Sequence, residues 1–496
     1  MAPLGHTVSQ MPRLDARGVI TLFSSGVLVA LSAWWWSPFW GVVVFAWLVG
    51  LYPAYRLLSG REKDPFAPIH LFALYTLLTI QFRAIFIRMG LSRVLQPLYD
   101  SQGDTLTGLL ILTLLATSLF LVAMYAGYYG RMPERLARAI PRLRDRTPTM
   151  TELWAALAIA GMIAIPVGGL LFARIGASVA VGKFTAETRA GGIFWLGYLL
   201  RIAVLGAMIP LAGRLPTARR PVLWMLAGLA MLAAGGVFLL WPKKIVLANQ
   251  ILGILVCIHY LRSRISVRTL VLTGLAALLM LPVLAAFRYL GFSGLSPKEL
   301  SQLASVALDN PQFVVQDLLR RSFGADSIVL IIDSLRHNPH YMFGGTFSEA
   351  TRWFIPRAFW PDKPPSEAIL FGQEYLRRSG EFSVNVSGTP TAVGELIQNF
   401  GIVGIIIGGW VAGVLIRLPY TFLIERGQSF AGVVLYATYL AGSVMFVEGP
   451  LEPQVMDVFI SLCLVIMLLA AMESWNSATL VWSKGRVVEM ASARRD

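Results

Sequence analysis

Three cations lie close together in a proline-rich stretch of the chain. Arg352, Arg357 and Lys363 fall within a segment, 352–365, that also holds four prolines. Proline limits backbone freedom, so charges in such a frame keep a fixed geometry. Arginine offers a planar fork for bidentate phosphate contacts, and lysine adds a compact point charge. The pattern predicts a pyrophosphate site, with a solvated surface loop as the alternative. Four aromatic residues between 353 and 360 favour a position of this segment, with its cations, at headgroup depth in the membrane interface.

A carboxylate follows this stretch where the next apolar segment begins. Glu395 stands just after Gly394, and the hydroxyl residues Ser387, Thr389 and Thr391 precede both. A helix start binds anions through its free backbone N–H groups, and a carboxylate at membrane depth is costly without a role or a partner. Glu395 is therefore a candidate general base. The alternative is a glutamate that favours the helix N-terminus and pairs with an arginine.

Other charges within or beside apolar segments extend the candidate site. Arg201 interrupts an apolar segment, and Lys243 and Lys244 form a short turn between two others. Such cations could complete a phosphate site, although long side chains also snorkel to the interface without any further role. Secondary candidates are the cations Arg83, Arg320 and Arg321, the alternative bases Glu448 and Glu452, and His340 as a proton carrier.

Several familiar motifs are missing from the sequence. The stretch from Gly176 to Lys183 is one residue too long for a phosphate loop, and Phe184 replaces the required Ser or Thr. The chain has no His-Glu-x-x-His, no zinc-spaced Cys/His cluster and no Asp-x-Asp. We therefore expect no metal and no cofactor. Cys257 and Cys463 both fall in apolar segments, so no disulfide framework is implied.

Composition sets the class of the protein. The 496 residues are 56% hydrophobic and only 14% charged, whereas soluble domains are about 25% charged. This balance predicts an all-α polytopic membrane protein, in which apolar residues face lipid as well as each other. Most of the net charge of +15 sits in short loops between apolar segments, so it sets topology and does not indicate a nucleic-acid partner.

Apolar runs of about 20 residues predict about twelve transmembrane helices. They lie near 18–36, 39–57, 68–87, 105–128, 151–173, 192–212, 222–240, 245–261, 269–287, 396–416, 430–447 and 455–473. With a cytoplasmic N-terminus, the inner segments hold 23 Lys and Arg and the short outer loops hold 7. This asymmetry predicts that both termini are cytoplasmic.

The spans divide the chain into four parts. Residues 1–287 form about nine N-terminal spans, 288–395 a large outer loop, 396–473 about three C-terminal spans and 474–496 a basic cytoplasmic tail. The loop should contain short helices, because Gln312–Arg320 (after Asn310-Pro311) and Ser327–Leu335 have helical apolar spacing. Thr346 to Glu349 also fits a capping box for a helix that ends before Pro356.

The order of residues between 344 and 404 resembles that of bacterial O-antigen and exopolysaccharide repeat-unit polymerases of the Wzy type. The matching elements are Gly344-Gly345, Ile355-Pro356-Arg357, Trp360-Pro361-x-Lys363-Pro364, Ser387–Thr391, Gly394-Glu395 and Asn399-Phe400-Gly401-x-x-Gly404. The rest of the chain agrees only in topology. The sequence separates this family poorly from O-antigen ligases, and a flippase for lipid-linked oligosaccharide or a non-catalytic export scaffold are further alternatives.

The resemblance implies a metal-independent glycosyltransferase similar to the membrane-embedded C type, acting on the periplasmic face of the bacterial inner membrane. Its substrate would be an oligosaccharide on undecaprenyl pyrophosphate, and a chain-length regulator and a flippase of the same pathway are candidate partners. Arg357 and Lys363, helped by Arg352, would hold the leaving pyrophosphate. From its position, Glu395 would orient or deprotonate the acceptor hydroxyl.

Overall fold

The computed structural model describes most of the apolar part of the chain. The described residues are 31–175, 193–240, 244–275, 324–348, 390–447 and 454–474, apart from gaps at 32, 36, 93–94, 96–102, 144–145 and 456, together with residues 355, 360, 362, 371 and 449. Within these ranges all regular secondary structure is helical. The expectation of an all-α membrane protein is therefore confirmed at this level.

The helices follow one another in this order: α2 (Pro38–Gly50), α3 (Tyr52–Leu58), α4 (Pro68–Thr76), the π-helix η1 (Leu77–Phe82), α5 (Arg83–Arg88), α7 (Gly103–Tyr128), α8 (Met132–Ala139), α9 (Met150–Ile175), α11 (Ile193–Arg214), α12 (Arg220–Leu240), α13 (Lys244–Leu261), α17 (Gly324–His337), α18 (Gly345–Ser348), α21 (Thr391–Tyr420), the π-helix η5 (Thr421–Glu425), α22 (Phe430–Ser443) and the 3₁₀ helix η6 (Val444–Val447). A further helix covers Asp457–Ser474.

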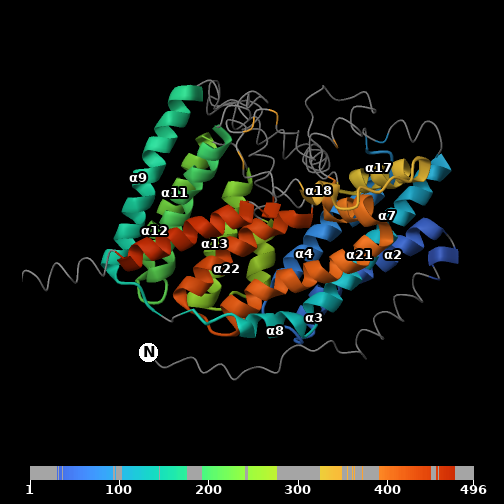
Figure 1. Cartoon of the computed structure of the whole chain (residues 1–496). Coiled ribbons are helices and arrows are strands. Elements are labelled where there is room, and N and C mark those ends of the chain that lie inside the picture. The colour runs from blue at the N-terminus through green and yellow to red at the C-terminus, as the bar shows by residue number, and fades with distance from the viewer. Residues whose placement is uncertain are drawn as a thin grey trace, which may run out of the picture.

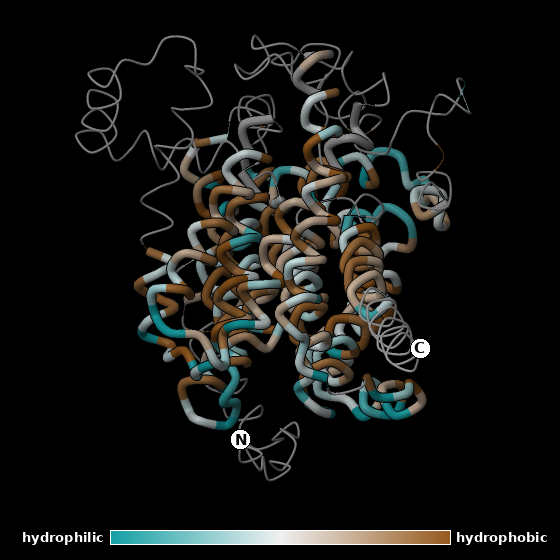
Figure 2. Tube along the Cα trace, turned by 90° about the vertical axis from the view of Figure 1, so that its left-hand side faces the viewer, coloured by the Kyte–Doolittle hydropathy of each residue, from teal (hydrophilic) through white to brown (hydrophobic). Residues whose placement is uncertain are grey.

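Six of these helical stretches in the described residues are long and apolar enough to cross a membrane. They are Pro68–Arg88, Asp104–Tyr128, Met150–Leu170, Arg220–Val237, Thr391–Glu425 and Asp457–Ser474. The pair α2 and α3, bent by 47°, would make a seventh if it is one broken span, and Val246–Leu261 and Phe430–Ser443 are shorter apolar helices. Figure 2 shows hydrophobic residues along the helices and hydrophilic residues mainly towards the two ends of the bundle.

Glycines allow α7 and α21 to pack closely. A Cβ atom added at Gly409 would lie 2.8 Å from the carbonyl oxygen of Phe120, and one at Gly413 would overlap the carbonyl oxygen of Met124. Gly127 on α7 meets the backbone of Trp410 in the same way. Small residues are typical of helix contacts in membranes, because backbones must approach closely where lipid removes the hydrophobic driving force.

α21 is broken at Gly401, whose backbone has φ 60° and ψ −142°. The break lets the first segment, Thr391–Phe400, turn back against the second: a Cβ at Gly404 would lie 2.5 Å from the carbonyl oxygen of Leu396, and one at Gly408 would overlap the Leu396 side chain. We call residues 391–400 the arm of α21. Helix residues eight and twelve positions apart do not touch in a straight helix, so the arm and the long segment form a hairpin.

We expect Gly401→Ala to destabilise this hairpin. The φ and ψ of Gly401 lie in a region that is essentially restricted to glycine, and strain of this kind costs about 1–3 kcal/mol. A Cβ atom there would also lie 3.3 Å from the Tyr341 ring. Thermal unfolding of the purified variant should show a lower midpoint. Gly228→Ala is the matched control, because a Cβ at Gly228 on α12 meets nothing within 4 Å, and an equal loss there would contradict the prediction.

The two ends of the bundle carry different elements. α17 and α18 lie at its upper end in Figure 1, whereas α3 and α8 lie at its lower end. The expected helix over 327–335 is confirmed as part of α17. The capping box is wrong in its register, because α18 begins at Gly345 and Thr346 lies inside it, where its hydroxyl accepts a bond from Asn399. The expected helix over 312–320 lies outside the described residues.

Candidate functional site

Asn399 joins the two ends of the segment that carries the resemblance. Its side-chain oxygen accepts the backbone N–H of Gly344 at 2.8 Å, and its side-chain nitrogen donates to the Thr346 hydroxyl at 2.7 Å. The backbone N–H of Phe343 donates to the Asn399 carbonyl at 3.1 Å. Asn399 is completely buried, so these bonds are made away from water. Residues 55 positions apart in sequence thus form one junction.

Glu395 lies one helical turn before Asn399 on the arm of α21. Its carbonyl oxygen accepts a second bond from the Asn399 amide at 2.8 Å, and its side chain is completely buried. Thr391 begins the arm with an unusual φ of 62°, and its hydroxyl accepts the Gly394 N–H at 3.0 Å. This hydrogen bond already uses one of the free N–H groups that the sequence offered to an anion. Glu395 is therefore closed off from solvent in this structure.

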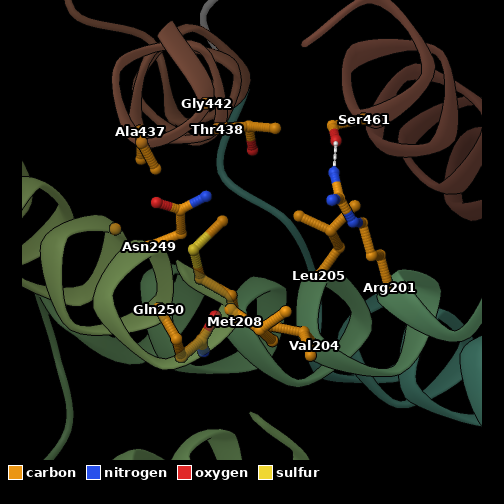
Figure 3. Close-up of a pocket in the computed structure, with 13 residues that line it drawn as sticks. Arg201, Val204, Leu205, Met208, Asn249, Gln250, Ala437, Thr438, Gly442 and Ser461 are labelled. Carbon is orange, nitrogen blue, oxygen red and sulfur yellow. Dashed lines mark hydrogen bonds between the residues drawn. The ribbon is translucent and has the colours of Figure 1, made fainter. Parts of the chain in front are cut away.

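A cavity opens between α11, α13, α22 and the helix Asp457–Ser474 (Figure 3). Its volume is about 60 Å³, which is room for a few water molecules. The walls are mainly apolar, and the polar exceptions are Arg201, Asn249, Gln250, Thr438 and Ser461. In Figure 3 the Asn249 amide points across the cavity towards α22. The Gln250 nitrogen is buried and has no hydrogen-bond partner in the described part of the chain.

Arg201 stands at the rim of this cavity with a carboxylate beside it. Its guanidinium lies 2.7 Å from Asp457 and donates to the Ser461 hydroxyl at 3.3 Å. Both side chains of the ion pair are largely buried, at 14% and 16% exposure. The expectation that Arg201 binds pyrophosphate did not take account of Asp457, whose carboxylate neutralises the arginine. Asp457 was visible in the sequence as an acidic residue at the start of an apolar segment, the same signal that singled out Glu395.

Arg83 is bound to α17. Its guanidinium makes two hydrogen bonds to the Asp326 carboxylate, at 2.7 and 3.0 Å, and the Ser92 hydroxyl donates to the same carboxylate at 2.5 Å. Arg83 is 3% exposed and Asp326 is 1% exposed. The geometry gives Arg83 a positioning role, because it ties α17 to α5 by a buried, bidentate ion pair. Asp326 was not among the residues that the sequence pointed to.

The opposite end of the bundle is tied together by tyrosines. The Tyr260 and Tyr420 hydroxyls both donate to Asp64, at 2.5 and 2.7 Å, and Tyr436 donates to the Phe66 carbonyl at 2.5 Å. These donors come from α13, α21 and α22 and converge on the short connection between α3 and α4. Tyr260 stands ten residues after Gln250 on α13, which is about 15 Å along a helix. The tyrosine network and the cavity therefore lie towards opposite ends of α13.

Glu62, in the same connection, has a raised pKa. Burial raises the pKa of its carboxyl from 4.5 to about 7, against the opposing effects of the hydrogen bond from Tyr129 and the charge of Arg56. Between pH 4.5 and 7 an unfolded chain loses this proton while the folded protein keeps it. The folded state is then the one with more bound protons, so its stability falls as pH rises through this window.

We expect Glu62→Gln to remove this pH dependence. A shift of this size corresponds to about 3 kcal/mol, so the variant should gain that much stability relative to the wild type between pH 4.5 and 8. Glutamine keeps an oxygen for the Tyr129 hydroxyl. The measurement is the denaturant midpoint of both proteins in detergent at several pH values. Glu473→Gln, with 70% of its side chain exposed, is the control, and a pH-independent difference for Glu62→Gln would contradict the prediction.

Only some of the expected site residues lie within the described part of the chain. Lys244 is the first residue of α13, and His340 is exposed after α17. Arg352, Arg357, Lys363, Lys243, Arg320, Arg321, Glu448 and Glu452 lie outside the described residues. In the part of the chain that is described, no group of three or more His, Cys, Asp or Glu side chains could hold a metal ion.

Comparison with known proteins adds no relative. No family model matches the chain, and neither a curated protein nor a solved structure does. The functional argument therefore depends on the residues and their geometry.

Proposed function

We propose that this chain is a membrane-embedded polysaccharide polymerase. It would transfer a growing glycan from undecaprenyl pyrophosphate to a hydroxyl of the next lipid-linked repeat unit, on the periplasmic face of a bacterial inner membrane. In this proposal the chain has about twelve spans, both termini are cytoplasmic, and residues 288–395 form a periplasmic loop.

The observation that carries the proposal is the Asn399 junction. The residue pattern that resembles the polymerases runs from 344 to 404, and Asn399 holds Gly344 and Thr346 beside the turn that carries Glu395. In the sequence, Arg352, Arg357 and Lys363 stand between the two elements that Asn399 joins. This transfer requires a carboxylate base and cations that hold the leaving pyrophosphate. The junction supports the proposal that Glu395 and the three cations form one site.

The chemistry assigned to these residues balances without a metal. The acceptor hydroxyl gives its proton to Glu395 as its oxygen attacks the anomeric carbon, and the bond from that carbon to the pyrophosphate oxygen breaks. The electron pair leaves with the pyrophosphate, whose added charge Arg357 and Lys363 stabilise, with help from Arg352. Because Glu395 is completely buried, the proposal includes a movement of the arm about Gly401 that admits the acceptor.

A flippase is the main rival, and two observations count against it. Transporters place their substrate site near the midplane between repeated halves. The sequence shows no internal repeat, and the cavity beside Arg201 has a volume of about 60 Å³, which is room for a few water molecules and not for an oligosaccharide. These features support an enzyme in preference to a transporter.

The test is mass spectrometry of undecaprenyl-linked glycans after the gene is deleted from its host, with an added glycosidase to mark the outer leaflet. We expect single repeat units to accumulate in the outer leaflet. Complementation with the wild-type gene should restore polymer, and Arg357→Ala should not, although the variant remains in the membrane. Arg336→Ala, an exposed cation at the end of α17, is the control and should restore polymer.

Three results would contradict the proposal. Repeat units trapped in the inner leaflet would indicate a flippase, and finished polymer stranded on the carrier would indicate a ligase. Full-length polymer made by Arg357→Ala would remove the pyrophosphate role from that residue.

A further inference from the structure

The short helix α8 presents three different faces. Pro133 and Ala137 are buried against the bundle, whereas Arg131, Arg135 and Arg138 are exposed. At 100° per residue, these three arginines share one face and the exposed Met132 and Leu136 share the next. The exposed fractions of Met132 and Leu136 are 41% and 37%. The pattern continues past the helix with Ile140, Arg142 and Leu143, all of them exposed.

The orientation of α8 is fixed by its neighbours. It packs against α21 and η5, and the guanidinium of Arg426 donates to the carbonyl oxygens of Ala137 and Ile140 at its C-terminal end. These bonds set which face of α8 meets the bundle. The arginine face and the apolar face are therefore held outwards together, at the lower end of the bundle in Figure 1.

The charge on this surface is almost uncompensated. Residues 131–142 hold four arginines and one acidic residue, Glu134. Glu134 lies 3.9 Å from Arg138, whose side chain is 71% exposed, and such exposed pairs contribute little. In the described part of the chain no ion pair is found for Arg131 or Arg135. Two or more cations are thus available to an anion from outside the protein.

The apolar face of α8 distinguishes between a free phosphate ion and a phospholipid as the bound anion. A free phosphate ion would satisfy arginines but would leave Met132 and Leu136 in water. A phospholipid at the membrane surface offers a phosphate to the arginines and the start of its acyl chains to the apolar face, which is how amphipathic helices lie in an interface. Anionic headgroups add an attraction of about 1 kcal/mol for each Lys or Arg near the surface.

We propose that α8, with residues 140–143, is a binding surface for anionic phospholipid headgroups of the adjacent membrane leaflet. The charge pattern of the loops makes this the cytoplasmic leaflet. The surface is separate from the cavity and from the Asn399 junction, so it does not depend on the proposed polymerase activity.

The experiment is native mass spectrometry of the full-length protein in detergent, titrated with phosphatidylglycerol or with phosphatidylcholine of the same acyl chains. We expect tighter binding of phosphatidylglycerol to the wild type. In Arg131→Gln/Arg135→Gln that binding should weaken about 10- to 30-fold, as two headgroup contacts at about 1 kcal/mol each imply. Arg131→Lys/Arg135→Lys should retain most of it, because the charge remains.

Matched variants separate this surface from general basic charge. Arg219→Gln/Arg220→Gln removes two exposed arginines at the turn into α12, which the charge pattern assigns to the same side, and should leave the tight site intact. Leu136→Gln should weaken both lipids. The proposal is overturned if the Arg219/Arg220 variant loses as much affinity as the α8 variant. It is also overturned if sodium phosphate displaces the lipid where sodium chloride of equal ionic strength does not, since the site would then bind a free anion.

Discussion

Asp326→Ala should destabilise the folded protein by about 3–5 kcal/mol, because it leaves the guanidinium of Arg83 buried without its partner. The pair is bidentate, with N–O distances of 2.7 and 3.0 Å, and neither side chain exceeds 4% exposure. The substitution also removes the acceptor of the Ser92 hydroxyl. We expect a lower thermal midpoint for the purified variant in lipid nanodiscs, together with loss of protease protection in α17, which the pair holds against α5.

Two further variants separate the ion pair from a general weakness of α17. Asp333→Ala changes the same residue type on the same helix, where Asp333 lies 3.6 Å from the exposed His337, and should cost less than about 1 kcal/mol. Arg83→Leu/Asp326→Leu removes both charges and should recover most of the lost stability, since apolar replacements of buried pairs are often neutral. If the double variant is as unstable as Asp326→Ala, the loss comes from packing and not from an unpaired charge.

The Arg83–Asp326 pair illustrates what the sequence could and could not indicate. A cation inside an apolar segment is costly, so Arg83 was recognisable as a residue with a role. Its partner was not, because 243 positions separate the two residues and hydrophobic periodicity carries no information about long-range pairing. The helix that presents Asp326 was predictable from apolar spacing at 327–335 and is confirmed within α17.

The turn of α21 shows a second limit of the same kind. Gly401 and Gly404 were visible as elements of a motif, and a glycine in a helical pattern signals a break or a close contact. The sequence did not say which of these applied. The structure gives both, with a positive φ at Gly401 and the Leu396 backbone against Gly404. An apolar run from 396 to 416 is equally compatible with a straight span, so the hairpin required tertiary information.

The tyrosines around Asp64 were not identified from the sequence. Tyr260 and Tyr436 stand in apolar segments and Tyr420 lies just after one, where an aromatic residue is as consistent with lipid contact as with a buried hydrogen bond. Asp64 follows three other charged residues, Arg61, Glu62 and Lys63, and so belonged to a segment whose charges were explained by membrane topology alone. Only the convergence of three helices on one connection reveals its role.

Glu395→Gln should lower the rate of polymer formation by about 10²- to 10⁴-fold, the usual contribution of a general base. Glutamine keeps the size of the side chain and leaves the backbone carbonyl that accepts the Asn399 amide, so the arm should keep its fold. Substrate binding should change little, because the pyrophosphate contacts belong to other residues in the proposed function. The measurement is the rate of single-turnover transfer between purified lipid-linked repeat units. Binding of the donor lipid to the same sample is measured in parallel and shows whether substrate binding is kept.

The alternative for Glu395 is a purely structural carboxylate, and stability separates the two. Its side chain is completely buried, so a structural role predicts that Glu395→Gln lowers the unfolding midpoint and that activity falls only with the amount of folded protein. A catalytic role predicts an unchanged midpoint, a lost rate and a pH–rate profile that no longer shows an ionising base. Glu395→Asp is informative in the same assay, because a shorter carboxylate keeps the base but withdraws it from the acceptor, giving a smaller loss of rate than glutamine. Normal turnover by Glu395→Gln would move the base to another carboxylate, with Glu448 and Glu452 the next residues to test.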